Sequence, residues 1–276
     1  MDFVFKRSYT GPVKAVVLDW AGTTVDYGCH APAIVFMEAF KRQGIEITMA
    51  QAREPMGMHK RDHIATILAM EPVAQAWNER YGQPPTGADA DRMYEEFVPL
   101  QIELLPQHAD LIPGTLEACE ALRASGVKIG TSSGYNNEMM AVLMKEAEKR
   151  GYVPDSMVCA TMVPAGRPAP WMCLQNAMNL GAYPMEAVVK IGDTRQDIYA
   201  GLNAGAWTIG LAMTGNLMGL TKAEEEALDP VTLEAKRAKA YEALASVGAH
   251  YVVDGIGDVP TVVAEISARL ACGERP

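Results

Sequence analysis

Residues 13–24 read VKAVVLDWAGTT, and this stretch decides the fold. Its apolar part, residues 13–18, ends abruptly at Asp19. A short apolar run with a polar residue directly after it is typical of a buried parallel strand with a functional group at its carboxyl end. Later runs repeat the pattern, and we expect further strands at Val127–Gly130, Met157–Ala160, Val188–Ile191, Ala206–Leu211 and Tyr251–Val253.

Helical patterns separate these runs. They cover Thr115–Ala124, Asn137–Lys149, Pro170–Asn179 and Gln196–Asn203. Strands that alternate with helices of this length predict a doubly wound α/β sheet, in which ligands bind beyond the carboxyl ends of the strands.

Residues 27–107 differ from the rest, because they hold helical segments and no convincing strand. We expect a Rossmann-like core built from residues 1–26 and 108–276, with residues 27–107 forming a helical cap inserted after the first core strand. A further charged stretch, Thr221–Ser246, predicts a helical surface element.

Composition narrows the class of protein. The formal net charge of −10 disfavours nucleic acid and anionic membranes as partners, since both attract clustered cations. The five cysteines show no CxxC spacing, and neither a signal peptide nor a membrane span is evident. We therefore expect a cytoplasmic protein that acts on a small molecule.

Polar residues follow several predicted strands. Asp19 follows the first, a hydroxyl run at residues 131–133 follows the second, and Asp193 follows a later one, with Asp197 four residues on. Arg167 stands in the segment Gly-Arg-Pro, just before a helix. Each feature alone has an ordinary explanation as a turn or a helix cap. Together they offer a carboxylate nucleophile, hydroxyls and a cation for phosphate, and oxygen ligands for Mg²⁺.

In this order on successive strands, these residues resemble the four motifs of the haloacid dehalogenase superfamily. That resemblance implies that Asp19 attacks phosphorus. The superfamily usually has a second Asp two residues later, which protonates the leaving oxygen, but position 21 is Ala. Its backbone carbonyl can still bind Mg²⁺, whereas general acid catalysis worth roughly two to four orders of magnitude is lost.

A lysine in the predicted cap offers another way to activate the leaving group. Lys60 stands near the start of a helix, where the helix N-terminus carries a partial positive charge, and Arg61 is its neighbour in the sequence. We expect both positive charges to lower the pKa of Lys60. A neutral lysine can form a Schiff base with an aldehyde. His63 lies three residues on, hence on the same helix face, and could move protons. A solvated surface position is the ordinary alternative for such a lysine.

A protonated imine next to a carbon–phosphorus bond lets an enamine leave, so that no acid is needed at Ala21. The segments that carry this combination are LDWAGTTVDYGCHAP, PMGMHKRDHI, GTSSGYNNEMM, GRPAPWM and KIGDTRQDIYAGLNAGAWTIGL. They resemble the phosphonoacetaldehyde hydrolase (phosphonatase) family, which uses Mg²⁺ and a lysine Schiff base to yield acetaldehyde and phosphate.

The resemblance implies a role for each matching residue. Asp19 would be the nucleophile, Lys60 would form the imine, and Asp19, Ala21 and Asp193 would ligate Mg²⁺ with support from Asp197. The remaining positions would bind substrate or line the site, and they are Cys29, Met56, Gly57, His63, Ser133, Tyr135 and Arg167. The family also implies a homodimer formed through the cap.

Other functions remain open at the level of sequence. A phosphatase or phosphomutase of the same superfamily would act on a phosphate ester, but Ala21 argues against it. A haloacid dehalogenase needs no metal, and Asp193 with Asp197 argues against that activity. A catalytically silent phosphate-binding protein would not need the set Asp19, Arg167 and Asp193.

Overall fold

The computed structural model describes residues 8–276, so the first seven residues of the predicted 1–26 core segment lie outside it. One parallel sheet forms the centre of the molecule, in the order β3-β2-β1-β4-β5-β6. Its strands are β1 Ala15–Leu18, β2 Lys128–Ser133, β3 Ser156–Cys159, β4 Val188–Gly192, β5 Trp207–Leu211 and β6 Tyr251–Val253. This order is that of a Rossmann-like sheet, and the predicted fold class is confirmed.

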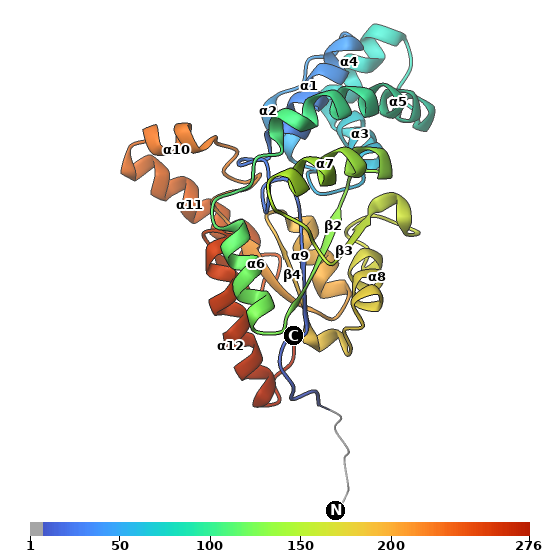
Figure 1. Cartoon of the computed structure of the whole chain (residues 1–276). Coiled ribbons are helices and arrows are strands. Elements are labelled where there is room, and N and C mark those ends of the chain that lie inside the picture. The colour runs from blue at the N-terminus through green and yellow to red at the C-terminus, as the bar shows by residue number, and fades with distance from the viewer. Residues whose placement is uncertain (1–7) are drawn as a thin grey trace, which may run out of the picture.

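Helices cover both faces of this sheet (Figure 1). The helices that follow β1 in the core are α6 Thr115–Ala124, α7 Asn137–Lys149, α8 Trp171–Leu180, α9 Arg195–Asn203, α10 Lys222–Ala227, α11 Pro230–Ala245 and α12 Val259–Ala271. Short 3-10 turns lie at Leu105–His108, Ala160–Met162, Met185–Ala187 and Ile256–Asp258. The alternation of side chains along β1 explains the layers, since Val16 and Leu18 pack with α6 and α12, whereas Ala15 and Val17 pack with α8 and α9.

A separate group of helices lies between β1 and β2 in the sequence and beyond the carboxyl end of the sheet (Figure 1). These helices are α1 His30–Arg42, α2 Met49–Arg53, α3 Lys60–Ala69, α4 Glu71–Tyr81 and α5 Gly87–Leu104. Large buried side chains such as Phe36, Trp77 and Phe97 pack between them. Thr48 and Thr86 begin α2 and α5 with capping boxes, which satisfy backbone N–H groups that the helices leave free.

Two chain segments join these helices to the core, and they lie side by side. Val25 pairs with Leu111 in an antiparallel bridge, and the Ile112 N–H donates to the Thr24 carbonyl at 2.9 Å. The Asp26 carboxylate lies 3.2 Å from His108 Nδ1, which links the same two segments through side chains. The helical group is therefore attached to the core through one paired connection.

Some element boundaries differ from the sequence-based expectation. Thr131, Ser132 and Ser133 belong to β2 itself, because their backbones pair with β3 through the end of the strand. The predicted element at Thr221–Ser246 is two helices, since the backbone at Leu228 and Asp229 is extended. Within residues 8–276, no helix is long and apolar enough to span a bilayer. The five cysteines are free thiols.

Candidate active site

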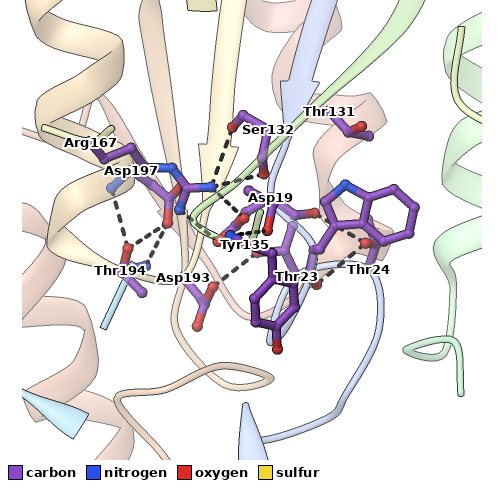
Figure 2. Close-up of polar contacts among 12 residues, drawn as sticks. Asp19, Thr23, Thr24, Thr131, Ser132, Tyr135, Arg167, Asp193, Thr194 and Asp197 are labelled. Atoms are coloured by element: carbon purple, nitrogen blue, oxygen red, sulfur yellow. Dashed lines mark hydrogen bonds and ion pairs between the residues drawn. The ribbon is translucent and has the colours of Figure 1, made fainter. Parts of the chain in front are cut away.

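Asp19 follows β1, the strand between β2 and β4, and a buried arginine clamps its carboxylate. Arg167 Nη1 donates to Asp19 Oδ2 at 2.9 Å, and Nη2 donates to Oδ1 at 2.6 Å (Figure 2). Nη2 also donates to the Ser132 carbonyl at 2.8 Å, so the strand β2 helps to fix the guanidinium. Such a bidentate pair holds both oxygens of the carboxylate in a defined plane.

Asp197 forms the second anionic group, and two cations surround it. Its Oδ1 lies 2.8 Å from Arg167 Nη1 and 2.7 Å from Lys190 Nζ. Although burial alone would raise the pKa of Asp197, the Arg167 and Lys190 charges lower it below its ordinary value. Sequence reasoning did not assign Lys190 a function. The available signal was a lysine inside the apolar run of β4, where a charge requires a buried partner.

Asp193 differs from Asp197 because, among residues 8–276, its hydrogen-bond donors are uncharged. Thr23 Oγ1 donates to its Oδ1 at 3.1 Å, and the Asn216 N–H donates to its Oδ2 at 2.7 Å. Burial raises the pKa of Asp193 to about 8, and repulsion from Asp19 and Asp197 acts in the same sense. One oxygen from each of these three carboxylates can lie within 4.8 Å of the others. A buried excess of negative charge with oxygen-only ligands fits a hard divalent cation such as Mg²⁺.

Lys60 approaches this group of carboxylates from the other side, as the first residue of α3. It is 4% exposed, and its Nζ lies 4.0 Å from Met56 Sδ. The same nitrogen lies 5.0 Å from the ring centroid of Tyr135 and 5.6 Å from that of Phe36. Lys60 therefore has sulfur and aromatic neighbours, and the structure shows no carboxylate in direct contact with it among residues 8–276.

The Lys60 pKa is lowered, as expected, and burial is the largest cause. Burial lowers this pKa to about 8, the Arg167 charge acts in the same direction, and Cys29 and Asp19 act against it. Arg61 is not among the main causes of this shift, and its side chain pairs with Asp91 at 2.8 Å.

One small cavity joins the two sides of the site. Its free volume is about 20 Å³, which is about the space of one water molecule. Its lining brings together most of the residues that the sequence singled out, and consists of Asp19, Ala21, Cys29, Pro32, Met56, Gly57, Lys60, Ser133, Gly134, Tyr135, Arg167 and Thr194. Ala21 packs against Cys29, Ala33 and Met56, so the position of the missing second Asp is apolar.

Gly57 closes the cavity where the inserted helices meet the core. Its φ is 93°, a left-handed conformation that favours glycine. A Cβ at this position would lie 2.5 Å from Thr194 Oγ1, so only glycine permits this close approach.

The structure does not bring His63 into the cavity. Its Nε2 donates to the Ala52 carbonyl at 2.9 Å, and its ring stacks on Phe36 with centroids 3.7 Å apart. Burial, together with the nearby Lys60 charge, holds the pKa of His63 well below its ordinary value. His63 therefore supports the packing behind Lys60, and its expected part in proton transfer stays a prediction.

Comparisons with known proteins agree with this geometry. A sequence model of the haloacid dehalogenase-like hydrolase family matches residues 13–205. A phosphonoacetaldehyde hydrolase-like protein of Syntrophobacter fumaroxidans is 51% identical over 275 residues, covering 99% of each chain. A phosphonoacetaldehyde hydrolase of Nitratidesulfovibrio vulgaris is 48% identical over 274 residues, covering 99% of this chain and 98% of that one.

A solved structure is similarly close. The phosphonoacetaldehyde hydrolase-like protein of Oleispira antarctica superposes with a TM-score of 0.97 at 41% identity, covering all of both chains. The fold, the strand-end carboxylates and the family match define a hydrolase of the haloacid dehalogenase superfamily, and within it the chain belongs to the phosphonoacetaldehyde hydrolase family.

Proposed function

We propose that this protein hydrolyses the carbon–phosphorus bond of phosphonoacetaldehyde, giving acetaldehyde and phosphate. One observation carries the proposal. Lys60 and Asp19 line the same cavity, one as a buried amine with a pKa of about 8 and the other as a carboxylate clamped by Arg167. The relatives whose printed names include this activity support the choice of substrate.

In the first half of the reaction, neutral Lys60 Nζ attacks the aldehyde carbon, and a water molecule leaves as the imine forms. A carboxylate oxygen of Asp19 then attacks phosphorus. The carbon–phosphorus bond breaks, and its electron pair moves into the protonated imine to give an enamine. Because carbon takes up this electron pair, no acid is required at Ala21.

In the second half, the enamine gains a proton on carbon, and water hydrolyses the resulting imine to release acetaldehyde and Lys60. A second water cleaves the aspartyl-phosphate, which releases phosphate and restores Asp19. One water is produced and two are consumed, so the net reaction uses one water per substrate.

Mg²⁺ would neutralise charge on the phosphoryl oxygens and so favour attack by an anion. Asp19, Asp193 and the Ala21 carbonyl would hold the ion. Asp197, which already has two cationic partners, would instead orient Arg167. Arg167 and Ser133 would bind the phosphoryl group from the core, and the apolar wall of Cys29, Met56, Gly57 and Tyr135 would exclude water from the imine.

Residues 27–107 would act as a cap that opens for the substrate. A cavity of about 20 Å³ is too small for phosphonoacetaldehyde, so the helices α1–α5 must move away from the core before the substrate can enter. Residues 1–26 and 108–276 would form the catalytic core. A cap-mediated homodimer and a cytoplasmic location remain predictions.

The test is trapping of the imine. The protein is incubated with phosphonoacetaldehyde, reduced with borohydride and mapped by peptide mass spectrometry. We expect a reduced two-carbon or phosphonoethyl adduct on the peptide that contains Lys60. Release of phosphate from simple esters, with no adduct, would instead indicate an ordinary phosphatase.

A further inference from the structure

The end of α2 is joined to the core by a pair of hydrogen bonds that we call the Arg53–Asn216 clasp. Arg53 Nη1 donates to Asn216 Oδ1 at 3.1 Å, and Asn216 Nδ2 donates to the Arg53 carbonyl at 3.1 Å. Arg53 Nη1 also donates to the Gly28 carbonyl at 2.8 Å, in the segment that leads into the cap. The clasp lies in a groove of about 470 Å³ between the two parts of the molecule.

Asn216 faces a different partner through its main chain. Its N–H donates to Asp193 Oδ2 at 2.7 Å, so one residue contacts the cap with its side chain and the metal-site carboxylate with its backbone. The neighbouring residue, Gly215, also packs against Asp193. A Cβ on Gly215 would lie 2.1 Å from Asp193 Cβ, so the backbone at this point rests directly on Asp193.

The start of the same loop is held by several hydrogen bonds to the core. The Ala212 and Met213 N–H groups donate to the carbonyls of Val253 and Asp254, both at 2.9 Å. Thr214 Oγ1 donates to the Gly22 carbonyl at 2.9 Å. The segment that leads into the cap also contacts this loop, because the Gly28 N–H donates to the Thr214 carbonyl at 2.8 Å. The side chain of Asn216 is the point at which a movement of α2 reaches the residue whose N–H donates to Asp193.

We propose that the Arg53–Asn216 clasp couples closure of the cap to the divalent-cation site, by setting the backbone donor that orients Asp193. This inference rests on the proposed Mg²⁺-dependent function. The cation then binds more tightly when the cap is closed. By thermodynamic reciprocity, the cation favours the closed cap by the same factor. Arg53 and Asn216 act as positioning residues, because neither side chain contacts the carboxylates.

The test uses two variants and two measurements. Asn216→Ala removes the side chain from the clasp and keeps the N–H that donates to Asp193. Arg53→Met removes the guanidinium from the cap alone. Isothermal titration calorimetry gives the Mg²⁺ dissociation constant, and the rate at which an acylating reagent labels Lys60, read by peptide mapping, reports on closure.

A matched control is available on α8. Asn179 also donates one side-chain hydrogen bond, to Ser156 Oγ at 3.0 Å, and accepts one, from Gln175 at 2.8 Å. Asn179→Ala thus removes the same kinds of bond as Asn216→Ala, but in a helix that does not touch the carboxylates. Thermal melting of all three variants checks that each is folded.

In the unchanged protein, we expect Mg²⁺ to slow the labelling of Lys60. Both clasp variants should weaken Mg²⁺ binding about tenfold and lose most of this protection, whereas Asn179→Ala should change neither. The two clasp variants must agree, because Arg53→Met also removes the bonds to the Gly28 and Cys29 carbonyls, whereas Asn216→Ala leaves Arg53 in place.

Three results would contradict the inference. Clasp variants that bind Mg²⁺ within about twofold of the unchanged protein would show that the loop holds Asp193 without the cap. Weakened binding with full Mg²⁺ protection of Lys60 would show that metal and closure are separate. An unchanged protein that binds no Mg²⁺ would overturn both this inference and the proposed metal dependence, whereas the first two results leave the proposed reaction intact.

Discussion

Two buried lysines, one in the core and one in the cap, have opposite surroundings. Lys190 on β4 is 0% exposed and lies 2.7 Å from Asp197 Oδ1 and 2.9 Å from the Ile191 carbonyl. Lys60 at the start of α3 is 4% exposed, and its Nζ lies 4.0 Å from Met56 Sδ. Lys190 is thus buried beside an anion, whereas Lys60 is buried among a sulfur atom and aromatic rings.

This difference in surroundings gives burial a different effect on each lysine. A buried ammonium needs a carboxylate to offset its lost hydration, and Asp197 supplies that to Lys190. Where no such partner is present, burial favours the neutral amine, and the pKa of Lys60 falls to about 8. Lys190 therefore forms an ion pair within the core, whereas Lys60 is more easily converted to the neutral amine that can act as a nucleophile.

The largest expected effect comes from replacing the nucleophile. Lys60→Arg should lower kcat for phosphonoacetaldehyde by at least about 10³-fold, because a guanidinium cannot form an imine. Phosphate release measured in a coupled assay tests this. Lys41→Arg makes the same exchange on the exposed end of α1 and should keep full activity. Turnover retained by Lys60→Arg would remove Lys60 from the mechanism.

Replacing the core lysine should instead affect the fold. Lys190→Met leaves Asp197 with Arg167 as its remaining cation and should lower the free energy of unfolding by about 3 kcal/mol. Urea denaturation followed by circular dichroism measures the loss. The exposed Lys239→Met serves as the control and should change stability little. An unchanged midpoint for Lys190→Met would mean that Arg167 alone suffices for Asp197.

Replacing the cap lysine by Met should have the opposite effect on the free energy of unfolding. Below pH about 8, Lys60 is an ammonium in both the folded and the unfolded chain, and folding must remove it from water. Lys60→Met removes this cost and should raise the free energy of unfolding at pH 7 by about 3 kcal/mol. The gain should shrink as the pH rises from 8 toward the unfolded pKa of about 10.4. A destabilised Lys60→Met protein in the same urea experiment would refute this contrast.

The smallest expected effect is a pH dependence. Only neutral Lys60 can attack the aldehyde, so kcat/KM should rise with pH and level off above about 8. At pH 7 it should lie about tenfold below the plateau. Stopped assays in constant ionic strength buffers give the profile. A flat profile from pH 6 to 9 would mean that Lys60 is already neutral, or that imine formation is not limiting.

The sequence predicts the core well because local patterns determine it. Apolar runs such as residues 13–18 form the expected strands in this chain, and their order on the sheet brings Asp19, Arg167 and Asp193 together. The family motifs also mark Lys60. The basis of its lowered pKa did not follow from the sequence, because burial among Met56, Phe36 and Tyr135 depends on packing between distant segments.

The supporting contacts are harder to predict for the same reason. Lys190 reads as one polar residue in an apolar strand, and its pairing with Asp197 appears only in the folded chain. Asn216 belongs to a loop without regular structure, and both of its partners are distant in sequence. His63 shares the helix with Lys60, yet its ring turns toward Ala52 instead of the cavity.

The small volume between Lys60 and Asp19 has a consequence for inhibitors. About 20 Å³ does not hold a compound of the substrate's size, so such a compound must enter and leave through movement of the helices α1–α5. Its residence time should therefore follow the rate at which the molecule opens, and only weakly the strength of its own contacts. Compounds whose contacts lie mainly on the core should then dissociate at similar rates, although their affinities differ.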